Sequence, residues 1–155
     1  MKKFLFSIGK KSKKAFQSQL ESKKKDKVLE DYWRFIEKNR KIILNQNKKD
    51  ILNANKKRLK ENFIKRLVLN DEKISSIISS IKKIIKLRDP INIILEKWKR
   101  PNGLNISKVS IPIGVIGVIY ESRPNVTSDI ACLCFKSGNS VILKGGSESF
   151  YSNKI

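Results

Sequence analysis

The sequence predicts an α/β fold in which a helical first part leads into a parallel sheet. Residues 10–88 space their apolar side chains at helical intervals. Two short apolar runs, 113–120 and 140–144, flank a helical stretch at 127–136, and this strand–helix–strand order is typical of a parallel α/β unit. Between the two parts, residues 91–110 contain Asn102-Gly103, a strong turn signal, and predict a β-hairpin or extended arm.

The clearest helix is predicted over Asp71–Leu87. Asn70 is a suitable N-cap, acidic residues occupy the first turn, and Pro90 follows the end. Its apolar side chains recur at steps of three and four, and one face therefore packs into a core: Ile74, Ile77, Ile78, Ile81, Ile84 and Ile85.

The earlier helices have weaker patterns. Asn39 is a candidate cap for a helix whose apolar residues are Ile42, Ile43, Ile51 and Leu52. The aromatic residues of this part follow the apolar stripes and are therefore expected to be buried: Phe16, Tyr32, Trp33 and Phe35.

The second part reads as two buried strands around a helix. The continuous run Ile113–Tyr120 suits a strand buried on both faces, and its Gly114 and Gly117 suit close packing. Thr127–Lys136 reads as a helix ended by Gly138, with Ile130, Leu133 and Cys134 facing inward. Ser140–Lys144 follows as the second strand, and Gly145-Gly146-Ser147 opens a further helix.

Several classes of protein are excluded by composition. The chain has no histidine, which removes Ser/His and Cys/His catalysis and most zinc sites. Its two cysteines, Cys132 and Cys134, are expected to be small buried residues without a disulfide. No apolar stretch reaches 18 residues, and the patch after Met1 is too short for a signal peptide, so a cytoplasmic protein with no membrane span is expected.

The net charge of +21 lies almost entirely in the first hundred residues. Such a field would attract nucleic acid without sequence specificity. The abundance of Lys, Ile and Asn together is also what A/T-rich codons would produce, with lysines on solvated helix faces. We expect the second explanation to hold and no specific nucleic-acid partner.

Polar residues follow both predicted strands, where ligands bind in open α/β sheets. Glu121, Ser122, Arg123 and Asn125 come after the first strand, and Lys144, Ser147 and Glu148 lie at or after the end of the second. Gly145-Gly146 is placed to offer backbone N–H groups to a phosphate, although no complete phosphate-loop motif is present. From spacing alone, plain packing of an α/β unit and a turn at Pro124-Asn125 explain the same residues.

Two segments resemble the signature of the gamma-glutamyl phosphate reductases, which belong to the aldehyde dehydrogenase superfamily. They are Ile113–Thr127, with its Tyr-Glu-Ser-Arg-Pro-Asn-Val-Thr string, and Leu133–Glu148. Upstream, Ile43–Asp50, Arg66-Leu67 and Asp89-Pro90 fall in the family's order and spacing.

The resemblance implies an incomplete aldehyde dehydrogenase architecture. Residues 1–90 would be the helical N-terminal part of the cofactor domain, 91–110 an oligomerisation arm, and 111–155 the start of a Rossmann-like NADP-binding unit. The family's reaction would be the NADPH-dependent reduction of L-glutamyl 5-phosphate to L-glutamate 5-semialdehyde and phosphate, in proline biosynthesis. A cysteine thioester would form on the way, and the full-length enzyme would be a homo-oligomer.

Site residues carry over by position. Asn125 would stabilise the oxyanion, whereas Glu121, Ser122 and Arg123 would line the substrate crevice. Lys144, Gly145, Gly146, Ser147 and Glu148 would bind the cofactor. Cys132 and Cys134 do not match the nucleophilic cysteine, so the 155 residues alone are expected to be inactive and poorly soluble. A non-catalytic remnant and a basic nucleic-acid-binding protein are the alternatives.

Overall fold

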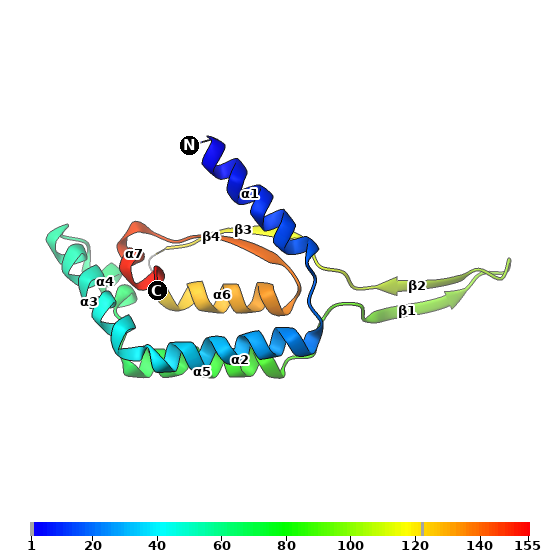
Figure 1. Ribbon diagram of the computed structural model, residues 1–155, viewed down its shortest axis with the longest axis horizontal. Coiled ribbons are helices and arrows are strands. Elements are labelled where there is room, and N and C mark those ends of the chain that lie inside the picture. The colour runs from blue at the N-terminus through cyan, green and yellow to red at the C-terminus, as the bar shows by residue number, and fades with distance from the viewer. Residues whose placement is uncertain (1, 122) are drawn as a thin grey trace.

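The computed structural model describes residues 2–121 and 123–155. Figure 1 shows a layered body with a long ribbon extending from one end. The helices are α1 (Lys2–Gln17), α2 (Ser22–Lys38), α3 (Arg40–Lys56), α4 (Glu61–Leu67), α5 (Asp71–Lys86), α6 (Pro124–Lys136) and α7 (Phe150–Asn153), the last preceded by a 3-10 turn, η1 (Ser147–Ser149). The strands are β1 (Ile94–Lys99), β2 (Asn105–Val109), β3 (Val115–Ile119) and β4 (Ser140–Lys144).

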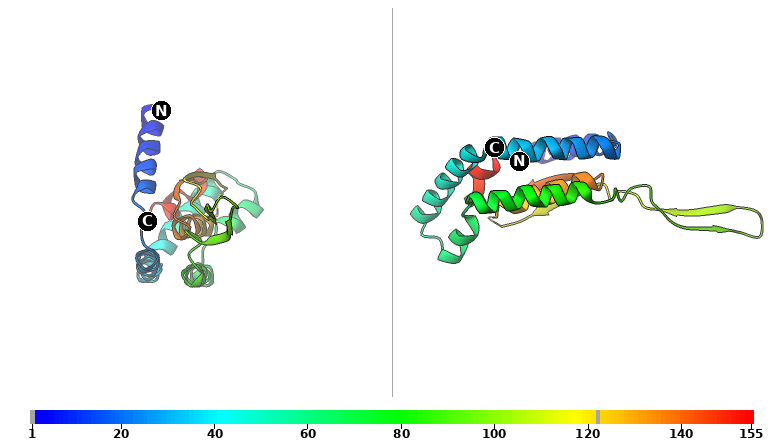
Figure 2. Two further views of the ribbon diagram at one scale, coloured as in Figure 1. Left: turned by 90° about the vertical axis from the view of Figure 1, so that its right-hand side faces the viewer. Right: turned by 90° about the horizontal axis from the view of Figure 1, so that it is seen from below.

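The core lies where α2, α5 and α6 meet. The stripe predicted on α5 is confirmed, since five of its isoleucines are buried and Ile85 is half-buried. The Asn70 side chain caps the helix by accepting a hydrogen bond from the backbone N–H of Lys73 at 2.8 Å. Seen from below, α2 and α5 run side by side, and α6 lies between them and the sheet (Figures 1 and 2).

Helix α3 buries polar residues where apolar burial was predicted. Ile42 and Leu52 are exposed, whereas Asn47, Asp50 and Ala54 are buried. The reason is tertiary: Asn47 and Asp50 hydrogen-bond to chain segments outside the helix. Asn39 precedes the helix but does not cap it, because its side chain donates to the carbonyl of Phe35 instead.

Among the described residues the parallel sheet has two strands, β3 and β4. The prediction that the first strand is buried on both faces is therefore wrong for this chain. Val115, Gly117 and Ile119 are exposed, the last by 81%. The close packing predicted at Gly117 is also absent, since a Cβ there would meet open space. Glycine is favoured at position 114 for another reason, because its φ of +128° is one that L-residues rarely adopt.

Helix α6 begins at Pro124, earlier than predicted, so Pro124 and Asn125 form its first turn instead of a break before it. Cys132 and Cys134 are buried and free, as expected, but Leu133 faces solvent and not inward. Phe35 on α2 is likewise exposed although its neighbours pack on the core. The predicted C-terminal glycine is confirmed: Gly138 has a φ of +69°, and a Cβ there would lie 2.2 Å from the Ile91 side chain.

Two buried lysines tie the base of the ribbon to the body. Lys25 of α2 pairs with Asp89 at 2.5 Å and donates to the carbonyl of Lys136. Lys136 pairs with Asp26 and donates to the carbonyl of Ile85. Burial alone would raise the pKa of Asp89, but the hydrogen bonds and the charge of Lys25 outweigh it, so the pKa is lowered.

The ribbon itself is the predicted hairpin, with β1 and β2 paired antiparallel. All of β1 is exposed, including apolar Ile94, Leu95 and Trp98. A two-stranded ribbon with so many exposed apolar side chains is only marginally stable alone.

Candidate functional site

The carboxyl ends of β3 and β4 lie at one edge of the sheet, as the sequence predicted. Ile119 is in register with Lys144, and the backbone N–H of Tyr120 donates to the Lys144 carbonyl at 3.1 Å. Figure 1 shows α3, α4 and α7 gathered at this end of the body. The segments that follow both strands therefore share a neighbourhood with three helices.

Hydroxyl and amide groups connect these segments. The Tyr120 hydroxyl hydrogen-bonds to Thr127 Oγ1 of α6 at 2.6 Å, and Thr127 Oγ1 donates to Asn153 Oδ1 of α7 at 2.9 Å. Asn153 in turn donates to Ser149 Oγ at 2.9 Å. This chain of hydrogen bonds fixes the start of α6 relative to the turn that follows β4.

Asn125 sits in the first turn of α6 with a half-buried side chain. One turn further along the helix, Asp129 has a buried Oδ1 that has no hydrogen-bond partner among the described residues. Burial raises the pKa of Asp129, and the nearby Asn125 amide offsets part of that rise. The Asn125 amide therefore lies close to a poorly solvated carboxyl group at the start of α6.

Glu121 and Arg123 are both exposed, and the backbone N–H of Arg123 donates to the Glu121 carbonyl at 2.7 Å. The Glu121 carboxylate pairs with Arg66 of α4, whose Nη1 lies 3.2 Å from Oε2. Arg66 belongs to the part of the sequence that resembles the family, but the sequence predicts no role for it in the site. Ser122, the remaining predicted residue of this segment, lies outside the described residues.

Lys144 is exposed at the end of β4, and Gly145 packs closely below Tyr120 and Asn153, where a Cβ would approach within 3.1 Å of the Tyr120 ring. Gly146 directly precedes η1, in which Ser147 Oγ donates to Glu148 Oε1 at 3.0 Å. Ser147 and Glu148 line a cavity of about 280 Å³ together with residues of α3 and its end: Asp50, Asn53, Ala54, Lys56 and Lys57. The two lysines were not predicted as site residues.

The thiols of this region are unsuited to attack a substrate. Burial raises the pKa of Cys132 to about 11, and it also raises that of Cys134. A thiol with such a pKa stays protonated near neutral pH, and the thiolate is the nucleophile. In the described part of the chain, no three His, Cys, Asp or Glu residues gather as a metal site would require.

Curated relatives match this chain over most of its length. It is 44% identical over 151 residues, 96% of the chain, to the gamma-glutamyl phosphate reductase of Carboxydothermus hydrogenoformans. It is 46% identical over 129 residues to that of Nautilia profundicola. The chain is homologous to part of gamma-glutamyl phosphate reductase.

Solved structures agree with the sequence match. The gamma-glutamyl phosphate reductase of Thermotoga maritima superimposes with a TM-score of 0.93 at 38% identity, over 97% of this chain and 37% of that one. The Saccharomyces cerevisiae reductase gives 0.89 at 32% identity, over 94% of this chain and 38% of that one. A putative aldehyde dehydrogenase from Bacillus subtilis, 15% identical with a TM-score of 0.71, shows the wider fold.

The match covers only part of each relative. The chain spans 31% of the Nautilia reductase and 36% of the Carboxydothermus reductase, about a third of each. No protein-family profile matches the chain. Among the described residues, no helix is both long and apolar enough to cross a membrane.

Proposed function

We propose that these residues form part of a cytoplasmic, NADP-dependent enzyme that reduces L-glutamyl 5-phosphate to L-glutamate 5-semialdehyde and phosphate in proline biosynthesis. One observation carries the proposal: the described residues of the Tyr-Glu-Ser-Arg-Pro-Asn segment, and the Lys-Gly-Gly-Ser-Glu segment, lie at the carboxyl ends of two paired parallel strands. Ligands bind at such edges in open α/β sheets. The nucleophilic cysteine of the proposed reaction is neither Cys132 nor Cys134.

The residues after β4 fit a phosphorylated dinucleotide. Lys144 offers a positive charge at the strand end, and Ser147 and Glu148 offer groups that hydrogen-bond to ribose hydroxyls. Lys56 and Lys57 add positive charge at the same cavity, which suits a phosphate group and supports NADP over NAD. When bound, the nicotinamide cofactor supplies the hydride, and the chain's own residues orient it.

Asn125 is proposed to donate an amide N–H to the oxyanion that develops on the substrate. The half-buried position of Asn125 in the first turn of α6 would limit the motion of the amide before the reaction begins. In enzyme produced from the complete coding sequence, we expect Asn125→Ala to lower kcat by about 100- to 1000-fold.

The assay follows NADP- and phosphate-dependent oxidation of glutamate semialdehyde, the reverse of the proposed reaction. Asn55→Ala, which truncates an exposed amide on α3, is the matched control and should leave the rate unchanged. An inactive wild-type enzyme that is folded would refute the proposed function. Full activity in Asn125→Ala would refute only the role of Asn125.

The ribbon formed by β1 and β2 is proposed to contact a second subunit. Its support is the exposed apolar set Ile94, Leu95 and Trp98 on a strand with no covered face. We expect Trp98→Lys to shift the full-length enzyme to a smaller species in analytical ultracentrifugation, whereas Lys97→Ala, on the opposite side of the strand, should not. Identical sedimentation of Trp98→Lys and wild type would rule the ribbon out as the contact.

A further inference from the structure

The ion pair between Arg66 and Glu121 joins residues 55 positions apart in the chain. Both side chains are well exposed, 47% for Arg66 and 63% for Glu121. Pairs this exposed contribute little to stability, typically a few tenths of a kcal/mol. A contribution to the stability of the fold therefore does not explain this ion pair.

The backbone next to Arg66 is held unusually firmly. Buried Asn47 accepts a hydrogen bond from the Leu69 N–H at 2.8 Å and donates to the Leu67 carbonyl at 2.9 Å. The Lys73 ammonium donates to the carbonyls of Val68, at 2.5 Å, and Lys65. Leu67 itself is 1% exposed. Arg66 thus projects from a fixed helix end to the segment that follows β3.

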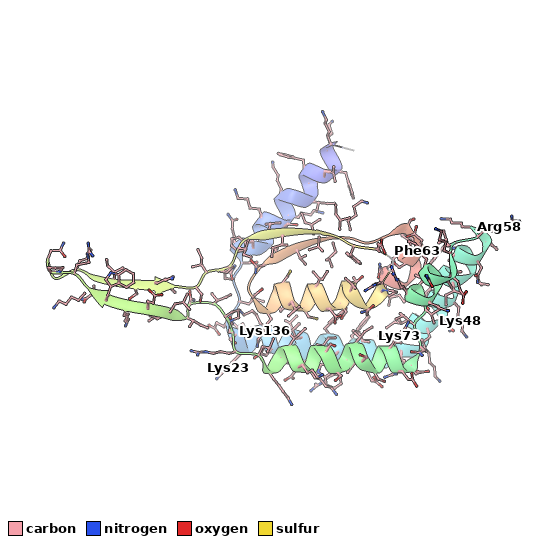
Figure 3. The ribbon with its side chains drawn as sticks, turned by 180° about the vertical axis from the view of Figure 1, so that it is seen from behind. Lys23, Lys48, Arg58, Phe63, Lys73 and Lys136 are labelled. Atoms are coloured by element: carbon pink, nitrogen blue, oxygen red, sulfur yellow. The ribbon has the colours of Figure 1, made fainter. Side chains whose placement is uncertain are left out.

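Figure 3 shows where this helix end lies. Phe63 of α4 and Lys73 at the start of α5 are labelled at the end of the body that carries α7, opposite Lys136. The same end holds the carboxyl edges of β3 and β4. An exposed guanidinium and an exposed carboxylate are therefore held side by side at the edge where the substrate is proposed to bind.

We infer that Arg66 and Glu121 together bind the α-carboxylate and α-ammonium groups of the acyl substrate, an inference that rests on the proposed function. Arg66 pairs with the α-carboxylate, for which a guanidinium fork is suited, and Glu121 accepts from the α-ammonium. The pair is the electrostatic complement of a zwitterion, with each charge already beside the other. The two side chains pair with one another across 3.2 Å, and each would exchange that partner for the opposite charge of the zwitterion.

The test compares two aldehydes in the full-length enzyme: glutamate semialdehyde, and glutarate semialdehyde, which lacks the α-amino group. Arg66→Met should raise the KM for both aldehydes by about 10- to 100-fold, because a charge-assisted hydrogen bond to the carboxylate is lost. Arg66→Lys should restore part of the loss. Glu121→Gln should remove the preference for glutamate semialdehyde and leave the KM for glutarate semialdehyde unchanged.

The KM values for NADP and for phosphate should stay at their wild-type levels in all three variants. The matched control is Lys65→Met, which breaks an exposed ion pair with Glu61 in the same helix and should change nothing. An altered KM for phosphate in Arg66→Met would overturn the inference and assign Arg66 to the phosphate. Unchanged aldehyde KM values in an active enzyme would overturn it too. A folded but inactive wild-type enzyme would instead refute the proposed function, and the inference with it.

Discussion

Replacing Lys136 by Met is expected to lower the free energy of unfolding by about 3 to 5 kcal/mol, the usual cost of breaking a buried ion pair from one side. Lys136 is 4% exposed, so its charge is almost fully desolvated and depends on its partners. Met keeps the length of the side chain but leaves the Asp26 carboxylate without its cation and the Ile85 carbonyl without its donor.

Urea unfolding followed by circular dichroism would measure the change. Lys83→Met removes an exposed lysine from α5 and should shift the midpoint by far less. Equal midpoints for the two variants would mean that the Lys136 network contributes nothing beyond a surface charge.

Replacing Asn47 by Leu is expected to lower the free energy of unfolding by about 2 to 5 kcal/mol. Leu has a similar volume but forms no hydrogen bonds, so buried polar groups would lose their partner and could not reach water. The Leu67 carbonyl and the Leu69 N–H would both lose their partner. The hydrogen bond that Asn47 donates to the Ser152 hydroxyl would also be lost. Asn47 is 1% exposed, so solvent cannot replace these bonds.

The same urea titration would test this variant, with the exposed Asn55→Leu in the same helix as its control. A second readout is hydrogen exchange at the Leu69 amide, which should become much faster in Asn47→Leu alone. Slow exchange at Leu69 in that variant would show that another group satisfies the amide and would contradict the prediction.

Helix α5 could be predicted from sequence because its fold depends on a local pattern. Six isoleucines at helical spacing, with Asn70 before them and Pro90 after them, define both its face and its ends. Helix α3 could not be predicted in the same way. Its buried residues are polar, and their partners lie about 20 and 100 residues further along the chain. The only local signal is the spacing of Ile43, Asn47, Asp50 and Ala54, which places all four on one helical face.

In the candidate site, too, local features could be predicted from the sequence and long-range contacts could not. Strand ends are local features of the sequence, so the pairing of the end of β3 with the end of β4, at Ile119 and Lys144, was predictable. The approach of Arg66 to Glu121 was not, because it depends on Asn47 and Lys73 holding the end of α4. The exposure of β3 was missed for a further reason. An apolar run predicts that a strand will be covered, but it does not say whether the covering segment lies within these residues.

The buried carboxylate of Asp50 has a consequence for the order in which the chain folds. Asp50 accepts hydrogen bonds from the backbone N–H groups of Tyr151 and Ser152, at 3.0 and 2.8 Å, which lie 101 and 102 residues later. During synthesis, Asp50 therefore emerges from the ribosome well before the groups that satisfy it. Until then the carboxylate must stay hydrated, which keeps this face of α3 undocked. Closure of this end of the molecule is thus a late, long-range step, and a nascent chain paused before residue 151 should expose α3 to protease while α5 is already helical.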